Sequence, residues 1–162
     1  WTAVSHLEAL GKALREAGAV PVGALALETL RIEAGIPAYG RDVDETVILP
    51  ETRLDAFVSF TKGCYIGQET VARVKYRGHI NRGLSGMVLE GDRVPAHGDA
   101  ITAEDKEVGR VTSAIRSIAL GKPIALGYIR REYFAAGTAV TIVTGEGATP
   151  ARVAELPFVR PA

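Results

Sequence analysis

Residues 62–69, Lys-Gly-Cys-Tyr-Ile-Gly-Gln-Glu, are the part of the sequence best suited to chemistry, and they contain the one cysteine of the 162-residue chain. Lys62 places a cation two positions before the Cys64 thiol. Gly63 and Gly67 allow tight backbone paths and the close approach of a ligand. We expect Cys64 to lie at or just before the start of a helix, where free N–H groups favour the thiolate. Cys64 is therefore a candidate nucleophile, mixed-disulfide partner or transient metal ligand.

The alternative is that Cys64 has no chemical role and fills a small space in the core. Free cysteine is among the most commonly buried residue types, so this interpretation has strong support from burial statistics. The residues around Cys64 are not the apolar neighbours that such a position normally has. A structural zinc site is excluded by ligand count, because one cysteine and three scattered histidines give no pair at metal-binding spacing.

Opposite charges are concentrated in two stretches near this motif. The first stretch contains one acidic residue, Glu69, and five basic residues: Lys62, Arg73, Lys75, Arg77 and Arg82. The second stretch contains one basic residue, Arg53, and five acidic residues: Asp42, Asp44, Glu45, Glu51 and Asp55. A solvated basic face paired with an acidic loop would give this pattern. So would a basic strip that binds an anion, such as a polyglutamate tail, a pterin-linked carboxylate or a phosphate backbone.

Aromatic and charged residues close to the basic stretch also have two interpretations. Tyr65 and Tyr76 could stack on a flat heterocycle, or they could cover the neighbouring fold. Glu69 and Arg73 are four residues apart, and we expect them to form an ion pair on a helix surface rather than an acid/base unit.

The composition limits the class of protein. A content of 47% apolar residues is enough for a core in one domain or two small ones. Lys+Arg and Asp+Glu both number 19, so no global charge indicates a nucleic-acid or membrane partner. A single cysteine fits a reducing, cytoplasmic compartment. No apolar run approaches the ~20 residues that span a bilayer. The start lacks both a secretory signal and a methionine, and we expect a carboxy-terminal part of a longer protein.

Residues 1 to about 80 are typical of helices and loops. Apolar residues recur at helical spacing over 4–14 and 24–34, and glycine and proline follow each run. In the second run Leu27, Leu30 and Ala34 form one apolar stripe, with charged residues on the other faces. Proline and glycine break up 36–55, although 46–49 could be a short strand. Good helix formers predict a third helix over 67–76.

From about Arg82 the sequence changes to short β-prone runs separated by turn residues. The runs cover 83–91, 99–103, 107–115, 123–134, 138–145 and 151–158. Ile124, Leu126 and Tyr128 alternate as in a half-buried strand. Five or six short strands favour a small closed barrel over an open sheet, because closure removes exposed edges.

Residues 62–69 closely resemble the signature of the YgfZ-type folate-binding proteins. These are relatives of the glycine-cleavage T-protein that support iron–sulfur enzyme maturation and tRNA modification. The resemblance extends to both sides, since 28–45 look like a segment shared by the T-protein superfamily and 69–84 continue the pattern. Residues 108–114 and 124–130 are similar to the carboxy-terminal barrel of that superfamily, so the match covers most of the chain.

The resemblance implies an α+β fold with two parts. Residues 1–80 would be the carboxy-terminal part of a T-protein-like folate-binding α/β domain, and residues 81–162 a small antiparallel β-barrel domain. The implied ligand is tetrahydrofolate or a one-carbon derivative. Iron–sulfur client proteins or tRNA are possible partners, with no membrane and no resident metal.

The resemblance also implies roles for individual residues. Lys62 and Cys64 match the positions thought to matter for activity. The positions expected to complete the folate site are Gly63, Tyr65, Gly67, Gln68 and Glu69, and Arg73 of the basic strip joins them. The chemical role of Cys64 stays open between capture or relay of a sulfur or iron species and protection of a folate adduct.

Two other classes of function remain. One is aminomethyl transfer to tetrahydrofolate, as in the T-proteins. Those proteins carry an arginine where this chain has Leu27, four residues before the arginine matched by Arg31, and they lack the cysteine motif. Their folate-contacting and catalytic carboxylates would precede Trp1. The other class is a non-enzymatic module whose barrel docks on a client protein or tRNA. Whether the protein turns over a substrate is left open.

Overall fold

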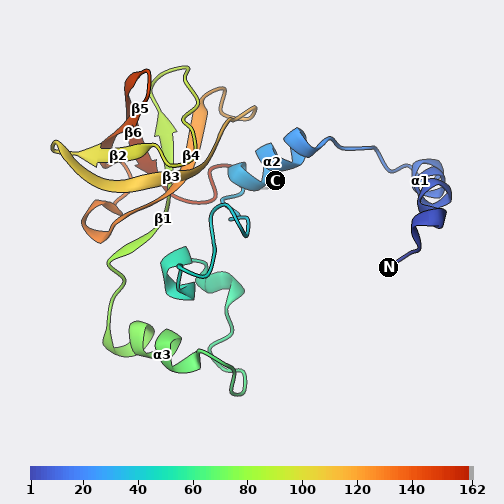
Figure 1. Ribbon diagram of the computed structural model, residues 1–162, viewed down its shortest axis with the longest axis horizontal. Helices are drawn as coiled ribbons and strands as arrows, with labels where there is room; N and C mark the ends of the chain where they lie inside the picture. The colour runs from blue at the N-terminus through green and yellow to red at the C-terminus, as the bar shows by residue number, and fades with distance from the viewer. Residues whose placement is uncertain (161–162) are drawn as a thin grey trace.

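A computed structural model describes residues 1–160, and its chain runs from separate helices into a β-barrel (Figure 1). The helical segments of the first half are η1 (Val4–His6), α1 (Leu7–Glu16), α2 (Ala24–Glu33), η2 (Leu49–Thr52), η3 (Asp55–Phe57) and α3 (Gln68–Arg77). The second half contains β1 (Arg82–Leu89), β2 (Ala100–Ala103), β3 (Lys106–Arg116), β4 (Pro123–Arg130), η4 (Arg131–Tyr133), β5 (Ala139–Thr144) and β6 (Gly147–Ala154).

The six strands form a closed antiparallel barrel in the order β1-β4-β3-β2-β5-β6. The barrel predicted from the short β-prone runs is therefore confirmed. Its interior is filled by aliphatic side chains that include Met87, Ile101, Ile129 and Ile142, each with 0% exposure. Closure pairs every strand on both edges and so protects backbone groups that an open sheet would leave free.

Glycines let strands β3 and β4 approach one another closely. A Cβ atom added at Gly109 would lie 2.0 Å from the Tyr128 carbonyl oxygen. A Cβ added at Gly127 would lie 2.5 Å from the Arg110 carbonyl oxygen. The pairing also shifts register between Val111 and Ser113, as at a β-bulge. Both glycines therefore occupy places where no side chain fits.

Strand β4 is buried on both faces, so the prediction of a half-buried strand is wrong. Ala125 and Ile129 point into the barrel core, and Ile124, Leu126 and Tyr128 belong to a second cluster on its outer surface. Helix α2 covers that outer cluster with Ile32, and the segment after β6 covers it with Leu156 and Phe158.

Helix α2 has the predicted position but presents a different face to the barrel. The expected apolar stripe lies outward, since Leu27 is 64% and Leu30 is 58% exposed. The buried side chains of the helix are Thr29, Ile32 and Glu33. The helix turns this way because charged and polar groups on the inner face find hydrogen-bond partners on the barrel.

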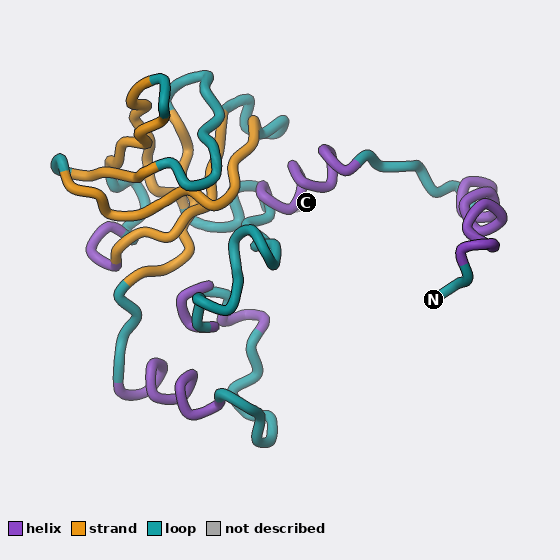
Figure 2. Tube along the Cα trace, in the orientation of Figure 1, coloured by secondary structure: helices purple, strands orange, loops and turns teal. Residues whose placement is uncertain are grey.

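Helix α1 stands apart from the rest of the molecule (Figure 1, blue). None of its residues is buried, and a loop over 17–23 connects it to α2. The predicted helices over 4–14 and 67–76 are confirmed by α1 and α3. The short strand considered over 46–49 is wrong, because that stretch forms turns and the start of η2, drawn as loop and helix in Figure 2.

Among the helices of residues 1–160, none is long and apolar enough to cross a membrane.

Candidate functional site

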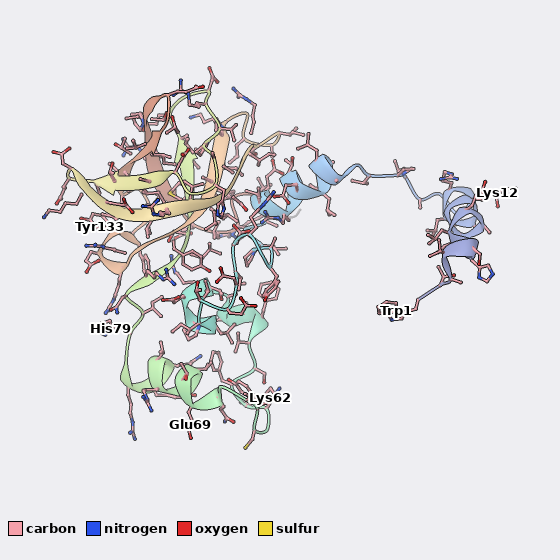
Figure 3. The ribbon with its side chains drawn as sticks, in the orientation of Figure 1. Trp1, Lys12, Lys62, Glu69, His79 and Tyr133 are labelled. Atoms are coloured by element: carbon pink, nitrogen blue, oxygen red, sulfur yellow. The ribbon has the colours of Figure 1, made fainter. Side chains whose placement is uncertain are left out.

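The motif at 62–69 lies at the end of the molecule away from the barrel, where Figure 3 shows Lys62 and Glu69. Lys62 and Cys64 are both exposed. Helix α3 begins at Gln68 with Gly67 as its N-cap in a left-handed conformation, φ 90°. Cys64 therefore precedes the helix by a short turn and does not belong to its first turn.

The exposure of Cys64 contradicts the interpretation of this thiol as a core filler. Lys62 reaches back over the ring of Tyr65, with its Nζ 5.0 Å from the ring centroid. This arrangement places a cation over an aromatic face in the segment that also carries the exposed thiol. Within residues 1–160, no cluster of three or more His, Cys, Asp and Glu residues is placed to hold a metal ion.

The glycines and glutamine of the motif have separate structural roles. Position 67 favours glycine because its φ is positive, and this conformation lets the chain turn into α3. Gly63 faces open space with an ordinary backbone conformation. Gln68 is half-buried at the first position of the helix, and Glu69 is exposed.

The acidic and basic stretches of the sequence partly pair with one another. Lys75 lies 3.9 Å from a carboxylate oxygen of Asp55, and Arg82 lies 3.2 Å from one of Glu51. The other three basic residues of the strip, Lys62, Arg73 and Arg77, have no carboxylate within 4.0 Å in the part of the chain described. The expected Glu69–Arg73 pair does not form there, since both side chains point into solvent on α3. The strip thus keeps three cations for another partner.

A network of buried and half-buried polar side chains joins α2 to the barrel, and no pattern in the sequence predicted it. Arg31 donates two hydrogen bonds to the carboxylate of Glu28, at 2.5 and 2.7 Å. It also donates to Asp42 Oδ2 at 2.8 Å and to Ser113 Oγ at 2.8 Å. We call Glu28, Arg31, Asp42, Thr112 and Ser113 the α2–barrel network.

Asp42 is at the centre of the α2–barrel network and is 2% exposed, whereas Asp44 and Glu45 of the same acidic stretch are exposed. The Asp42 carboxylate accepts hydrogen bonds from Arg31, from the Ala38 amide at 2.9 Å and from Thr112 Oγ1 at 2.5 Å. A buried carboxylate needs such partners to offset its lost hydration. Hydrogen bonds from Arg31 hold the pKa of Glu28 below its ordinary value of 4.5.

This network could not be located from helical periodicity alone, because the periodicity of aliphatic residues indicated the opposite face of α2. One signal was available: Thr112 and Ser113 are adjacent polar residues inside an otherwise β-prone run. Buried hydroxyls of that kind require a partner.

Two cavities lie between the barrel and residues 34–80, and they share the side chain of Arg53. The first, of ≈ 430 Å³, lies between residues 34–36, the η2–η3 segment and the end of β6. The second, of ≈ 580 Å³, lies between η2 and α3 and includes Phe60, Val71 and His79. Neither is lined by Lys62, Cys64 or Tyr65.

The motif residues fit a folate ligand only as one side of a site. A pterin needs a flat apolar surface, which Tyr65 offers, and the carboxylates of a folate tail need cations, which Lys62 and Arg73 offer. None of the three lines either of the two cavities beside Arg53, so further groups would be needed to enclose the ligand.

Comparison with known proteins identifies the barrel. Residues 82–160 match the family described as the glycine cleavage T-protein C-terminal barrel domain. Over 157 residues the chain is 36% identical to an aminomethyltransferase of Halothermothrix orenii, which covers 97% of this chain and 44% of that protein. It is 38% identical over 156 residues to an aminomethyltransferase of Chlorobium phaeovibrioides, covering 96% of this chain and 42% of that protein.

A solved structure has the same fold. The crystal structure of the glycine cleavage system aminomethyltransferase T from Bartonella henselae aligns with a TM-score of 0.85 over 96% of this chain, at 23% identity. The alignment covers 44% of that chain. The present chain thus spans less than half the length of the relatives that it matches.

Proposed function

Since residues 82–160 form a glycine cleavage T-protein C-terminal barrel domain and the chain corresponds to the C-terminal portion of the T-protein superfamily, we propose that it is part of a tetrahydrofolate-binding protein of one-carbon metabolism. Aminomethyl transfer to tetrahydrofolate is the activity proposed first. The observation that supports this proposal is the sequence similarity to two aminomethyltransferases, which extends over 96–97% of the chain. In this proposal residues 1–80 end the folate-binding domain and residues 81–162 are the barrel domain.

The chain's own residues would contribute one side of the folate site. Lys62 and Arg73 would hold the carboxylates of the folate tail, since neither has a carboxylate partner among residues 1–160. Tyr65 would present its ring to the flat part of the ligand. Gly63, Gly67, Gln68 and Glu69 would shape the turn that carries these groups.

A second candidate is the accessory function of the YgfZ type, which supports iron–sulfur enzymes and tRNA modification. The observation that favours it is the exposed Cys64 thiol, two residues after Lys62, in a segment that resembles the YgfZ signature. Leu27, at a place where T-proteins carry arginine, also favours it over aminomethyl transfer. Client proteins or tRNA would then be the partners.

Titration of the full-length protein with tetrahydrofolate tests the shared part of both candidates. We expect Lys62→Ala to weaken binding about tenfold or more, because a charge-assisted hydrogen bond is lost, and Cys64→Ala to leave it nearly unchanged. Equal affinity in the wild type and in Lys62→Ala would remove the motif from the folate site.

Two activity measurements then separate the candidates. An aminomethyltransferase would transfer the one-carbon group to tetrahydrofolate, and the Cys64→Ser variant would keep that activity. An accessory protein would not transfer the one-carbon group. In cells that lack this protein, the wild type would restore the activity of iron–sulfur enzymes and the Cys64→Ser variant would not.

A further inference from the structure

Arg53 has an unusual backbone conformation for an arginine. It is the residue that ends η2, and its φ of 56° and ψ of 28° are left-handed. Left-handed backbone costs free energy in residues other than glycine and persists only where the surroundings enforce it. The residue is exposed, and the contacts that its side chain makes with the barrel can be followed atom by atom.

Three groups contact this side chain: the Phe134 ring, Ser85 Oγ and the Leu84 carbonyl oxygen. Its guanidinium carbon lies 4.4 Å from the centroid of the Phe134 ring. Its Nη1 donates to Ser85 Oγ at 3.1 Å. Gly83 makes room for both, because an added Cβ there would lie 2.9 Å from Arg53 Cδ and 2.9 Å from Phe134 Cζ.

The charge of Arg53 has no counter-ion in the described chain. No carboxylate of residues 1–160 lies within 4.0 Å of its guanidinium, and Nη1 is the only guanidinium nitrogen with a hydrogen-bond partner among those residues. Partial desolvation lowers the pKa of Arg53. By contrast, Arg31 has Glu28 and Asp42 as partners. An exposed arginine that lines a cavity and keeps free guanidinium donors is suited to receive an anion.

The cavity of ≈ 430 Å³ beside Arg53 has a mostly apolar wall. The apolar part of its lining includes Phe57, Leu84, Phe134, Leu156 and Pro157. Glu155 also lines it, without forming an ion pair with Arg53. A volume of this size suits a small organic molecule, and pockets of this kind combine an apolar wall with a few placed polar groups.

We propose that this cavity binds a small organic carboxylate, whose apolar body fills the space lined by Phe57, Phe134 and Leu156 and whose carboxylate pairs with Arg53. An inorganic anion would leave the apolar wall unfilled, and a neutral molecule would leave the guanidinium unpaired. This site is separate from the motif at 62–69, and the proposal does not depend on the proposed function.

A titration of the full-length protein with benzoate and with benzamide, followed by NMR chemical shifts, tests the proposal without any variant. The two molecules have nearly the same shape and differ in charge. We expect benzoate to bind at least about tenfold more tightly, because a charge-assisted pair with a guanidinium is stronger than a neutral hydrogen bond. Equal affinities, or tighter binding of inorganic phosphate than of benzoate, would overturn the proposal.

Three variants assign the effect to the cavity. Arg53→Met is expected to weaken benzoate binding about tenfold, and Glu155→Gln to strengthen it about two- to fivefold by removing a repelling charge. Arg93→Met removes an exposed arginine from another part of the barrel and should change nothing. If Arg53→Met fails to fold, the Glu155→Gln titration decides, and an unchanged or weaker affinity in that variant counts against the site.

A competition distinguishes two sources of the carboxylate. Displacement of bound benzoate by tetrahydrofolate would assign the site to a carboxylate of the folate, and simultaneous binding would assign it to a second ligand. Both outcomes require that benzoate binds at Arg53.

Discussion

Arg31 and Arg53 show how one residue type serves two purposes in the same chain. Arg31 uses its donors on Glu28, Asp42 and Ser113, and it fixes α2 to the barrel. Arg53 contacts the Phe134 ring and Ser85 but has no carboxylate partner among residues 1–160. The difference lies in the counter-charges, and only the second arginine is available to a ligand.

The Asp42→Asn substitution should destabilise the protein strongly. An asparagine can no longer accept all the hydrogen bonds from Arg31, Ala38 and Thr112, and it leaves a buried guanidinium without part of its counter-charge. We expect a loss of about 3–5 kcal/mol in the free energy of unfolding, measured by urea denaturation. Asp44→Asn in the exposed part of the same loop is the matched control and should cost about 1 kcal/mol or less.

At the scale of the elements, α2 and β4 are arranged around the outer face of the barrel. The helix packs Ile32 against Leu126 and its neighbours, while its leucines point outward. Strand β4 therefore carries no charged residue over 123–129, where every residue is buried, because α2 covers one side and the barrel core lies on the other.

A pair of substitutions on α2 tests which face is buried. Ile32→Ala should lower the free energy of unfolding by about 2–5 kcal/mol, because it removes a side chain with 0% exposure from a packed cluster. Leu30→Ala, at 58% exposure, should change it by less than about 1 kcal/mol. Similar costs for the two variants in the same denaturation experiment would contradict the observed orientation of the helix.

A glycine in the barrel provides a second test at this scale. Gly109→Ala should prevent normal pairing of β3 and β4, since the new Cβ would meet the Tyr128 carbonyl oxygen at 2.0 Å. We expect a loss of about 3 kcal/mol or more, or failure to fold, judged by thermal unfolding followed by circular dichroism. Gly63→Ala, which faces open space, serves as the control and should leave the melting temperature nearly unchanged.

Much of the fold could be predicted from local sequence patterns, and the α2–barrel network could not. Alternation and turn residues predicted the β-prone runs, because a strand is recognised from its own few residues. The partners of Arg31 are distant in sequence: Ser113 is 82 residues away. Leu27 and Leu30 indicated the wrong face for α2, because an apolar stripe does not say which surface will cover it. The exposure of Cys64 agrees with its polar surroundings in the sequence.

At the scale of the whole molecule, the attachment of α2 to the barrel should depend on pH. The pKa of Glu28 is lowered in the folded state by hydrogen bonds from Arg31, so its stabilising effect is present above its ordinary value of 4.5. That contribution is lost as the pH falls below 4.5 toward the folded-state value. The melting temperatures of the wild type and of Glu28→Gln should therefore differ most near neutral pH and converge in acid. A constant difference at all pH values would exclude Glu28 from this effect.

Helix α1 lacks any such attachment, and this has a consequence for spectroscopy in solution. Ten residues are fewer than an isolated helix needs to persist in water, and nothing in α1 is buried. Residues 1–162 on their own should therefore give a weaker helical signal in far-ultraviolet circular dichroism than their ribbon diagram suggests. Backbone amides of α1 should exchange with deuterium within seconds, while those of the closed barrel stay protected far longer.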